Sequence, residues 1–178
     1  TIGDHAFSNC SSLIQIEVEL NNSNYATQDG VLFDKTLKTL IQYPNGKDIS
    51  KYTIPTETTT LKTHCFYGSQ FLNEVYISSN VSIIETNPFA YCQNIKRIEV
   101  SEDNLQFKSI DGALYNYNLD TLISYPIGNK SLSYTTLNSV KTISKQSFMG
   151  SRNLIALIVT SNVNSIEDEA FGYMETLE

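Results

Sequence analysis

The sequence predicts a single α/β solenoid of 178 residues, built mostly from short parallel β-strands joined by turns or short helical segments. Two observations predict this fold: a template of apolar residues returns along the whole chain, and part of each copy alternates between apolar and polar residues. A third observation, a second motif that returns between the copies, predicts a β-hairpin inserted on alternate repeats.

The template begins with an aliphatic residue and places a Phe five residues later, followed by another aliphatic residue six positions after that Phe. Its five copies begin at Ile2, Leu61, Ile84, Ile143 and Ile166, so a long interval alternates with a short one. The complete pattern returns from Ile2 to Ile84 and again from Ile84 to Ile166, and we call this full interval the period. Such regular self-similarity is the signature of a repeat architecture. We therefore expect one solenoid domain over 1–178, with repeat units 1–60, 61–83, 84–142, 143–165 and, incomplete, 166–178.

Each complete copy has the spacing of a leucine-rich repeat. In the first copy Leu13, Ile16 and Val18 are followed by Asn21, which reads as L-x-x-L-x-L-x-x-N. The alternation predicts one short strand per copy with one buried face, over residues 13–18, 72–77, 95–100 and 154–159. The Asn or Asp after each strand is expected to bond backbone groups where the chain turns, and stacked copies would form an internal ladder.

The residue before each template Phe is small or is a proline. This column contains Ala6, Cys65, Pro88, Ser147 and Ala170. Small residues beside a large ring suit a tight turn or a short helical segment packed on the sheet. A proline cannot continue a helix interior, so Pro88 argues against a long regular helix here.

The longer units contain an additional motif that returns after one period. Asp29-Gly30 precedes one short apolar run and Asp111-Gly112 precedes its counterpart. A second apolar run follows a polar turn at 34–36 or 116–118, and Tyr-Pro ends it. Two β-prone runs joined by a polar turn predict a hairpin, with Asp-Gly marking the turn into it.

Composition and charge exclude several classes of function. Lys and Arg number 12 and Asp and Glu number 19, which gives a formal charge of −7. That balance argues against a nucleic-acid partner and against docking on anionic lipid. No window has the length and apolarity of a membrane-spanning helix, and the N-terminus does not read as a signal peptide. Because the chain begins and ends inside a repeat, we expect a fragment of a longer protein.

The short template, I-G-D-x-A-F-x-x-C-x-x-L-x-x-I-x-V, resembles the BspA-like leucine-rich repeat. The elements D-G-V-L-F and L-I-x-Y-P-x-G-K are also similar to that family, and the resemblance covers the whole chain. The sequence departs from the family pattern where Cys65 and Pro88 replace Ala, and where Ser69, Ser151 and Met174 stand at a position that often holds Cys. These departures indicate repeats that have drifted while keeping the same fold.

The resemblance implies a non-enzymatic protein-binding or adhesion module of a cell-surface or secreted protein. Members of this family occur in oral and gut bacteria and in mucosal protists, and they are associated with adhesion to host cells or matrix proteins. The resemblance therefore implies a host or matrix protein as partner, with no cofactor, no nucleic acid and no direct membrane insertion by this segment. This inference rests on analogy between folds, and function has to be argued from a site.

Few residues can carry chemistry. His5 and His64 share a template position, but two imidazoles fall short of the four ligands of a zinc site, so we expect a solvent-facing column and no metal. Cys10 and Cys92 share a column but lie two repeats apart, too far for a disulfide, and we expect them and Cys65 to be reduced. No catalytic residue is predicted, and a hydrolase that uses His64 or Cys65 is the least favoured hypothesis.

Four glycosylation sequons occur. Asn9 and Asn129 are expected to be exposed and are the candidate glycosylation sites, whereas Asn21 and Asn80 belong to the expected internal ladder and should be inaccessible.

The best candidate for function is the outward surface of the predicted strands, because solenoids bind through such extended sheets. Its candidate protein-binding residues are Gln15, Glu17, Glu74, Tyr76, Arg97, Glu99 and Ile158. The hairpin tips near Lys35 and Tyr117 are the rival contact points. The alternative function is a structural spacer or a self-assembling solenoid without a ligand of its own, since exposed solenoid ends favour end-to-end stacking.

Overall fold

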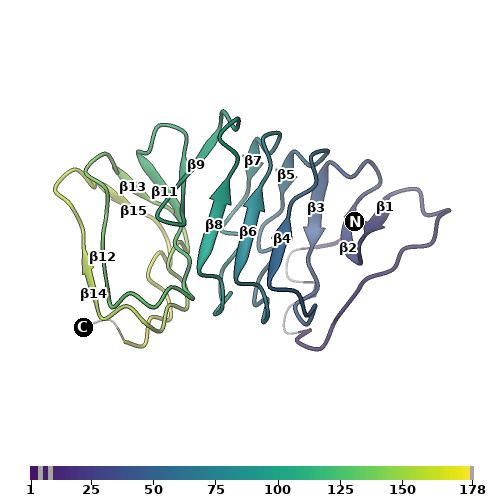
Figure 1. The fold of residues 1–178 in the computed structure, drawn as a ribbon, viewed down its shortest axis with the longest axis horizontal. Coiled ribbons are helices and arrows are strands. Elements are labelled where there is room, and N and C mark those ends of the chain that lie inside the picture. Colours follow the sequence, from purple (N-terminus) through teal and green to yellow (C-terminus); the bar gives the residue numbers. More distant parts are fainter. Residues whose placement is uncertain (4–5, 8–9, 177–178) are drawn as a thin grey trace.

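A computed structural model describes residues 1–3, 6–7 and 10–176. The chain winds into an elongated solenoid in which each circuit, here called a rung, stacks beside the next along the long axis (Figure 1). About six rungs are present, which confirms the solenoid of leucine-rich repeats that the periodicity predicts.

One side of the solenoid carries the strands that the alternating apolar residues predict. β4 (Lys51–Thr53), β6 (Glu74–Ile77) and β8 (Arg97–Val100) form a three-stranded parallel sheet. Further along the chain, β12 (Ser133–Thr135) pairs in parallel with β14 (Ala156–Ile158). The strands expected within 72–77, 95–100 and 154–159 are therefore confirmed. We call the outward surface of these five strands the strand face.

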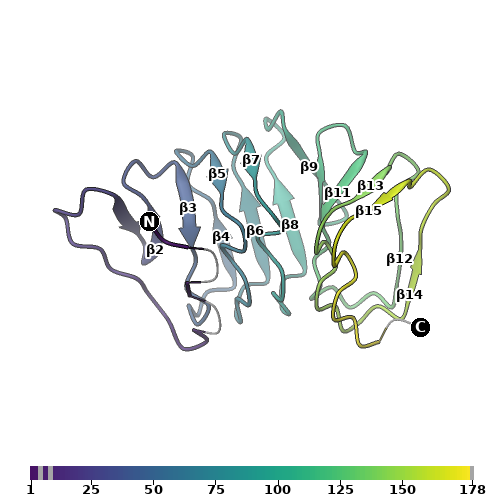
Figure 2. The same ribbon diagram turned by 180° about the vertical axis from the view of Figure 1, so that it is seen from behind.

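The opposite side of the solenoid carries a second series of strands (Figure 2). β3 (Thr39–Gln42), β5 (Thr60–Leu61) and β7 (Ile83–Ile84) are parallel neighbours. Their counterparts one period later are β11 (Thr121–Ser124), β13 (Thr142–Ile143) and β15 (Ser165–Ile166). The buried aliphatic residues of this side and of the strand face meet in the interior and form the core.

Two hairpins lie between groups of rungs. β1 (Tyr25–Gln28) pairs antiparallel with β2 (Val31–Asp34), and β9 (Phe107–Ile110) pairs with β10 (Ala113–Asn116) in the same way. The turn between β1 and β2 places Asp29 at φ 51° and Gly30 at φ 74°, two left-handed residues in succession, as a type I′ hairpin turn requires. β2 and β10 also pair antiparallel with β3 and β11, as the polar turns at 34–36 and 116–118 predict.

The hairpin tips interrupt the strand face. The backbone N–H of Ile98 in β8 donates to the carbonyl of Gly112 at 2.8 Å, so the turn between β9 and β10 occupies the edge where another parallel strand would pair. Ile16 donates to Gly30 in the same way, also at 2.8 Å. The strand expected over 13–18 is not formed, because this one bond to the hairpin tip replaces the ladder of a neighbouring strand.

The spacing of the hairpins differs from the prediction. Residues 39–54 form a rung of their own, because β3 pairs with β5 and β4 pairs with β6. The sequence pattern predicts only the second arm of a hairpin in this stretch. That arm is β3, which pairs antiparallel with β2 as well as with β5. The two hairpins do lie in the alternate units 1–60 and 84–142, as expected, but the additional rung in each of these units makes the interval between hairpins three rungs long.

The expected helical segments are also wrong, and the α/β description with them. The described residues contain no helix, and the columns around the template Phe form tight turns. In the rung of Phe66, the turn contains His64 at φ 57° and Gly68 at φ 68°. Left-handed residues this close together prevent the backbone from continuing into a right-handed helix.

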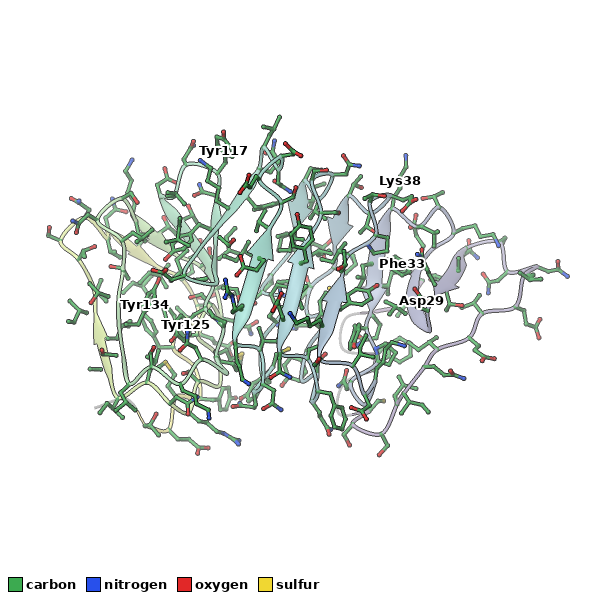
Figure 3. The ribbon with its side chains drawn as sticks, viewed as in Figure 1. Asp29, Phe33, Lys38, Tyr117, Tyr125 and Tyr134 are labelled. Atoms are coloured by element: carbon green, nitrogen blue, oxygen red, sulfur yellow. The ribbon has the colours of Figure 1, made fainter. Side chains whose placement is uncertain are left out.

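Aromatic rings fill the interior beside these turns. Phe66 is completely buried and lies 5.2 Å, between ring centroids, from both Tyr43 and Phe89. Its counterpart one period later is Phe148, which lies 5.0 Å from Tyr125. In Figure 3, Tyr125 lies inside this second group of rungs, whereas Tyr117 lies at the margin of the molecule. Phe66 and Phe148 are therefore central residues of the core in their two groups of rungs.

Candidate functional site

The strand face brings together four of the seven residues that the sequence analysis singled out. Across β4, β6 and β8, Lys51, Glu74 and Arg97 are register partners, and Thr53, Tyr76 and Glu99 form the adjacent row. Inward residues alternate with these, and Val75 and Ile98 are completely buried. The pleat of the sheet, in which successive side chains point to opposite faces, is the reason that these polar residues and Tyr76 face outward.

Ion pairs hold most of the charges in these two rows. Lys51 Nζ lies 3.1 Å from Glu74 Oε2, and Arg97 Nη2 lies 2.5 Å from Glu99 Oε1. Hydrogen bonding and charge attraction from Glu99 raise the pKa of Arg97, which stays a cation. Pairs this exposed contribute little to stability, because water and salt screen them. Their effect is to present a surface of alternating charge around Tyr76.

A hollow of about 470 Å³ lies at the end of this surface. It is lined by Tyr76, Glu99, Val100, Ser101, Glu102 and Asp103. Glu99 is held by Arg97 and by the hydroxyl of Ser109, which donates to its Oε2 at 3.3 Å. Glu102 and Asp103 form no ion pair with a described residue, so this end of the strand face is anionic. The alternation of the strand does not reach these two residues, and the sequence analysis missed them.

The remaining candidate residues lie elsewhere. Ile158 is 57% exposed and lies on β14, in the separate sheet beyond the second hairpin. Gln15 and Glu17 lie in the segment that forms no strand, and Gln15 Nε2 donates to Glu17 Oε1 at 2.9 Å. The seven residues therefore belong to three separate patches, because the two hairpin tips divide the strand face.

The rival contact points lie in the turns that join β2 to β3 and β10 to β11, and they are exposed as expected. Tyr117 is 41% exposed, and Lys108 Nζ lies 3.9 Å from the centre of its ring. Lys35 is exposed, and its Nζ donates to the carbonyl of Leu20 at 3.1 Å. Each of these side chains already has a partner within the chain.

The histidine column is buried at three of its positions, where the expectation that it faces solvent is wrong, whereas its last member, Glu169, is exposed. His64, Asn87 and Gln146 are each at most 7% exposed, while His5 lies outside the described residues. His64 Nε2 is hydrogen-bonded to Gln146 Oε1 at 2.5 Å, and Asn87 Nδ2 donates to the Gln146 carbonyl at 2.7 Å. Gln146 Nε2 donates to Glu169 at 2.6 Å. The column is a hydrogen-bonded ladder that joins successive rungs, since buried polar groups require such partners.

Replacing the central residue of this ladder should destabilise the protein. Gln146→Leu removes the partner of His64 Nε2 and is expected to lower the free energy of unfolding by about 2 kcal/mol, the typical cost of a buried polar group left without its hydrogen bond. Urea unfolding followed by circular dichroism measures this loss. The control is Lys145→Leu at the adjacent exposed position, expected to change the value by less than about 0.5 kcal/mol. Equal effects of the two substitutions would show that the ladder contributes nothing.

The three cysteines are free thiols, as expected. Cys65 and Cys92 are completely buried, and burial raises the pKa of Cys65 well above its usual value and that of Cys92 to about 12. Cys92 Sγ donates to the carbonyl of Phe66 at 2.9 Å. Both buried thiols are therefore protonated at neutral pH, which removes the nucleophilic thiolate that a hydrolase using Cys65 would need.

The exposure of the sequons differs from the prediction. Asn21 and Asn80 are both exposed. Asn80 does form the expected bond between rungs, because its Nδ2 donates to the Thr56 carbonyl at 2.7 Å, but it does so at the surface. Asn129 is half-buried, and Asn9 lies outside the described residues.

The buried asparagine of the turn is a different residue, which the sequence analysis missed. Asn104 is 1% exposed and donates to the carbonyls of Ser78 and Val81, each at 2.9 Å. Its Oδ1 accepts from the backbone of Gln106 and Phe107, each at 2.8 Å, where the chain enters β9. Asn22 lies one period before Asn104, and its Oδ1 accepts from the backbone of Asn24 and Tyr25 where the chain enters β1. The recurrence of Asn at this position was the sequence signal that could have identified Asn104 as the turn residue.

The described part of the chain contains no group of three or more His, Cys, Asp or Glu residues that could hold a metal ion. Within the same residues, no helix has the length and apolar character needed to cross a membrane.

Stacked rungs, parallel strands on one side and the recurring L-x-x-L-x-L spacing define a leucine-rich-repeat protein. The chain belongs to the BspA type leucine-rich repeat family, whose family profile matches residues 1–122 and 43–178. No curated protein matches the chain.

Solved structures of bacterial proteins share this fold. A leucine-rich repeat protein from Eubacterium ventriosum is 30% identical, with a TM-score of 0.71 over 75% of this chain and 36% of that one. The pneumococcal vaccine antigen PcpA is 23% identical, with a TM-score of 0.61 over 75% of this chain and 39% of that one. A leucine-rich cell surface protein from Faecalibacterium prausnitzii is 22% identical, with a TM-score of 0.59 over 73% of this chain and 40% of that one. The chain thus spans well under half of each of these proteins.

These comparisons indicate no enzyme family, and both the repeat family and the solenoid fold are typically non-catalytic. Leucine-rich repeats are generally protein-interaction modules.

Proposed function

We propose that this chain is a protein-binding, adhesive module of a cell-surface or secreted protein, and that it contacts a host or matrix protein through the strand face. The contact centres on the sheet of β4, β6 and β8, with Tyr76 as its anchor. Tyrosine is enriched among the residues that dominate binding at protein interfaces. The description of one structural relative as a cell surface protein and of another as a vaccine antigen supports the cellular location.

One observation carries this proposal: inward residues of the strands keep their chemistry from one period to the next, whereas the outward residues at positions 51, 74 and 76 do not, although the outward Thr53 recurs as Thr135 and Glu99 repeats Glu17. Val75 corresponds to Leu157, both of them aliphatic and turned inward. The outward Tyr76, in contrast, corresponds to Ile158. The outward Glu74 and Lys51 correspond to Ala156 and Ser133. The fold therefore accepts unrelated side chains at these outward positions, and the charged and aromatic set on β4, β6 and β8 is available for recognition.

The test compares two faces of the same chain. Glu74→Ala, Tyr76→Ala and Arg97→Ala are combined in one variant, and Ile83→Ala and Ile166→Ala, at exposed positions of β7 and β15 on the opposite side, form the matched control. Binding to immobilised matrix proteins and to host cells is measured by surface plasmon resonance and flow cytometry. The triple variant is expected to raise the dissociation constant at least about tenfold, which corresponds to about 1.4 kcal/mol, while the control stays within about threefold.

The other outcomes contradict the proposal in different ways. Binding that survives the triple variant would move the site to the turns near Lys35 and Tyr117 or to the opposite side. Folded protein that binds nothing in the panel but self-associates in analytical ultracentrifugation would favour the self-assembling spacer.

A further inference from the structure

A second hollow lies on the turns that join the two sides of the solenoid, away from the strand face. It has a volume of about 390 Å³ and is lined by Ser11, Asn45, Tyr67, Gly68, Gln70 and Tyr91. That volume lies within the range of small-molecule sites, roughly 300–1,000 Å³. We call it the tyrosine hollow.

Two aromatic rings form its walls. The rings of Tyr67 and Tyr91 lie 5.2 Å apart between centroids, tilted by 52°, and both residues are half-buried. Gly68, at φ 68°, has no side chain to fill the space near them. Tyr173 continues the row, 5.7 Å from Tyr91, and it is 66% exposed. The hollow is therefore one end of a row of tyrosines that runs along several rungs.

A buried amide lies at its base. Asn45 is 4% exposed, and its Oδ1 accepts a hydrogen bond from Gln42 Nε2 at 3.3 Å. Its Nδ2 forms no hydrogen bond with a described residue and lies 3.6 Å from the position that a Cβ on Gly68 would occupy. Because Asn45 lines the hollow, this amide donor can bind an oxygen of a ligand there.

The described residues that line the hollow carry no charge. Burial raises the pKa of Tyr91 to about 12, so its phenol remains a hydrogen-bond donor at neutral pH. Neutral ring faces together with amide and hydroxyl groups match the chemistry of a sugar, which presents a C–H face to an aromatic ring and hydroxyl groups to amides. An anionic or cationic ligand would find no opposite charge among these residues.

The scaffold does not need this set of residues. At the equivalent positions of the next period, Asn45 is replaced by Ile127, which is 3% exposed, and Tyr67 by Met149, which is 6% exposed. The same turn is thus built with apolar side chains in the second period. The amide and the first ring are therefore specific to the tyrosine hollow.

We propose that the tyrosine hollow binds a neutral hexose unit of a glycan, stacked on Tyr67 and Tyr91 and hydrogen-bonded by Asn45, with Tyr173 contacting a further unit of the same glycan. This site is separate from the protein-binding strand face and stands whether or not that face has a partner.

The experiment uses the whole chain with maltopentaose, cellopentaose and mannopentaose as probes, measured by isothermal titration calorimetry. Tyrosine fluorescence gives a second readout, because the chain contains no Trp. At least one of these neutral oligosaccharides is expected to bind with a dissociation constant of about 1 mM or lower. Tyr91→Gly should weaken that binding at least about tenfold. This substitution suits the backbone, because Tyr91 has φ 59° and the preceding rung has Gly68 in the left-handed region.

Three comparisons make the result specific. Asn45→Ile, which copies the second period, should weaken binding about fivefold or more, and Met149→Ala and Tyr117→Ala should change it by less than about twofold. Unchanged thermal unfolding of Tyr91→Gly excludes loss of fold as the cause. Absence of binding to all three oligosaccharides, equal binding by Tyr91→Gly, or binding to a proline-rich peptide in their place would each overturn the proposal.

Discussion

Phe66→Ala is expected to lower the free energy of unfolding by about 4 kcal/mol, the largest effect of any single substitution considered for this protein. Phe66 is completely buried, and its ring contacts those of Tyr43, Tyr52 and Phe89 at centroid distances of 5.2, 5.9 and 5.2 Å. Truncation removes the buried ring and leaves a cavity between two rungs. The surrounding rings are fixed by their own rungs, so the cavity cannot close.

Guanidinium unfolding monitored by circular dichroism measures this loss. Phe71→Ala is the control, because Phe71 is 42% exposed on the same rung and should cost less than about 1 kcal/mol. Phe66→Leu should fall between the two, since the branched side chain refills part of the space. A loss below about 1 kcal/mol for Phe66→Ala would mean that the rungs slide together, and the rigid stack described above would be wrong.

Gly128→Ala is expected to cost about 3 kcal/mol through steric overlap rather than a cavity. A Cβ at this position would stand 2.5 Å from the carbonyl carbon of Asn94 and 2.8 Å from the amide nitrogen of Ile95. Both atoms belong to the backbone of the preceding rung, so no side-chain rotation relieves the overlap. The bond from Gly128 N–H to the Ile95 carbonyl, now 2.8 Å, would lengthen as the rungs separate.

The matched pair for this prediction is Gly46→Ala and Gly3→Ala. Gly46 is the counterpart of Gly128, and a Cβ there would stand 2.6 Å from the carbonyl oxygen of Ser11, so it should show a similar loss. No described residue lies within 4 Å of a Cβ on Gly3, and its substitution should change stability by less than about 0.5 kcal/mol. Differential scanning calorimetry of the three variants measures these losses. Equal melting temperatures for all of them would show that close backbone contact is not the role of Gly128 and Gly46.

Periodicity was sufficient to predict the repeat fold, because a solenoid places equivalent residues in equivalent surroundings. Phe66 and Val75 are buried for the same reason as their counterparts, so their spacing alone predicts their place. Periodicity could not show that β3 has two roles. It is an arm of a hairpin, because it pairs antiparallel with β2, and it is also a strand of the solenoid, because it pairs parallel with β5. It could not reveal the turns either, because His64 and Gln146 adopt left-handed backbone angles that are uncommon for their residue types.

The candidate sites were predictable only in part. Outward positions such as Tyr76 and Glu99 follow from the alternation within a strand. The limits of their patch do not, because the hairpin tip at Gly112 that ends it comes from a separate motif. The tyrosine hollow escaped prediction for a related reason. Asn45 and Tyr91 come from different rungs and lie together only after the chain has completed its circuits.

The hairpin tip at Gly112 also makes the period a separable unit. It ends the sheet of β4, β6 and β8, so the outward residues of this patch do not pair with those of the next patch on β12 and β14. Duplicating, deleting or transplanting a whole period would add or remove one binding surface and leave its neighbours intact. Cutting at any other place would split a sheet. Recombination within the gene, or grafting in the laboratory, can therefore move one whole period as a unit. Binding specificity would then change one period at a time.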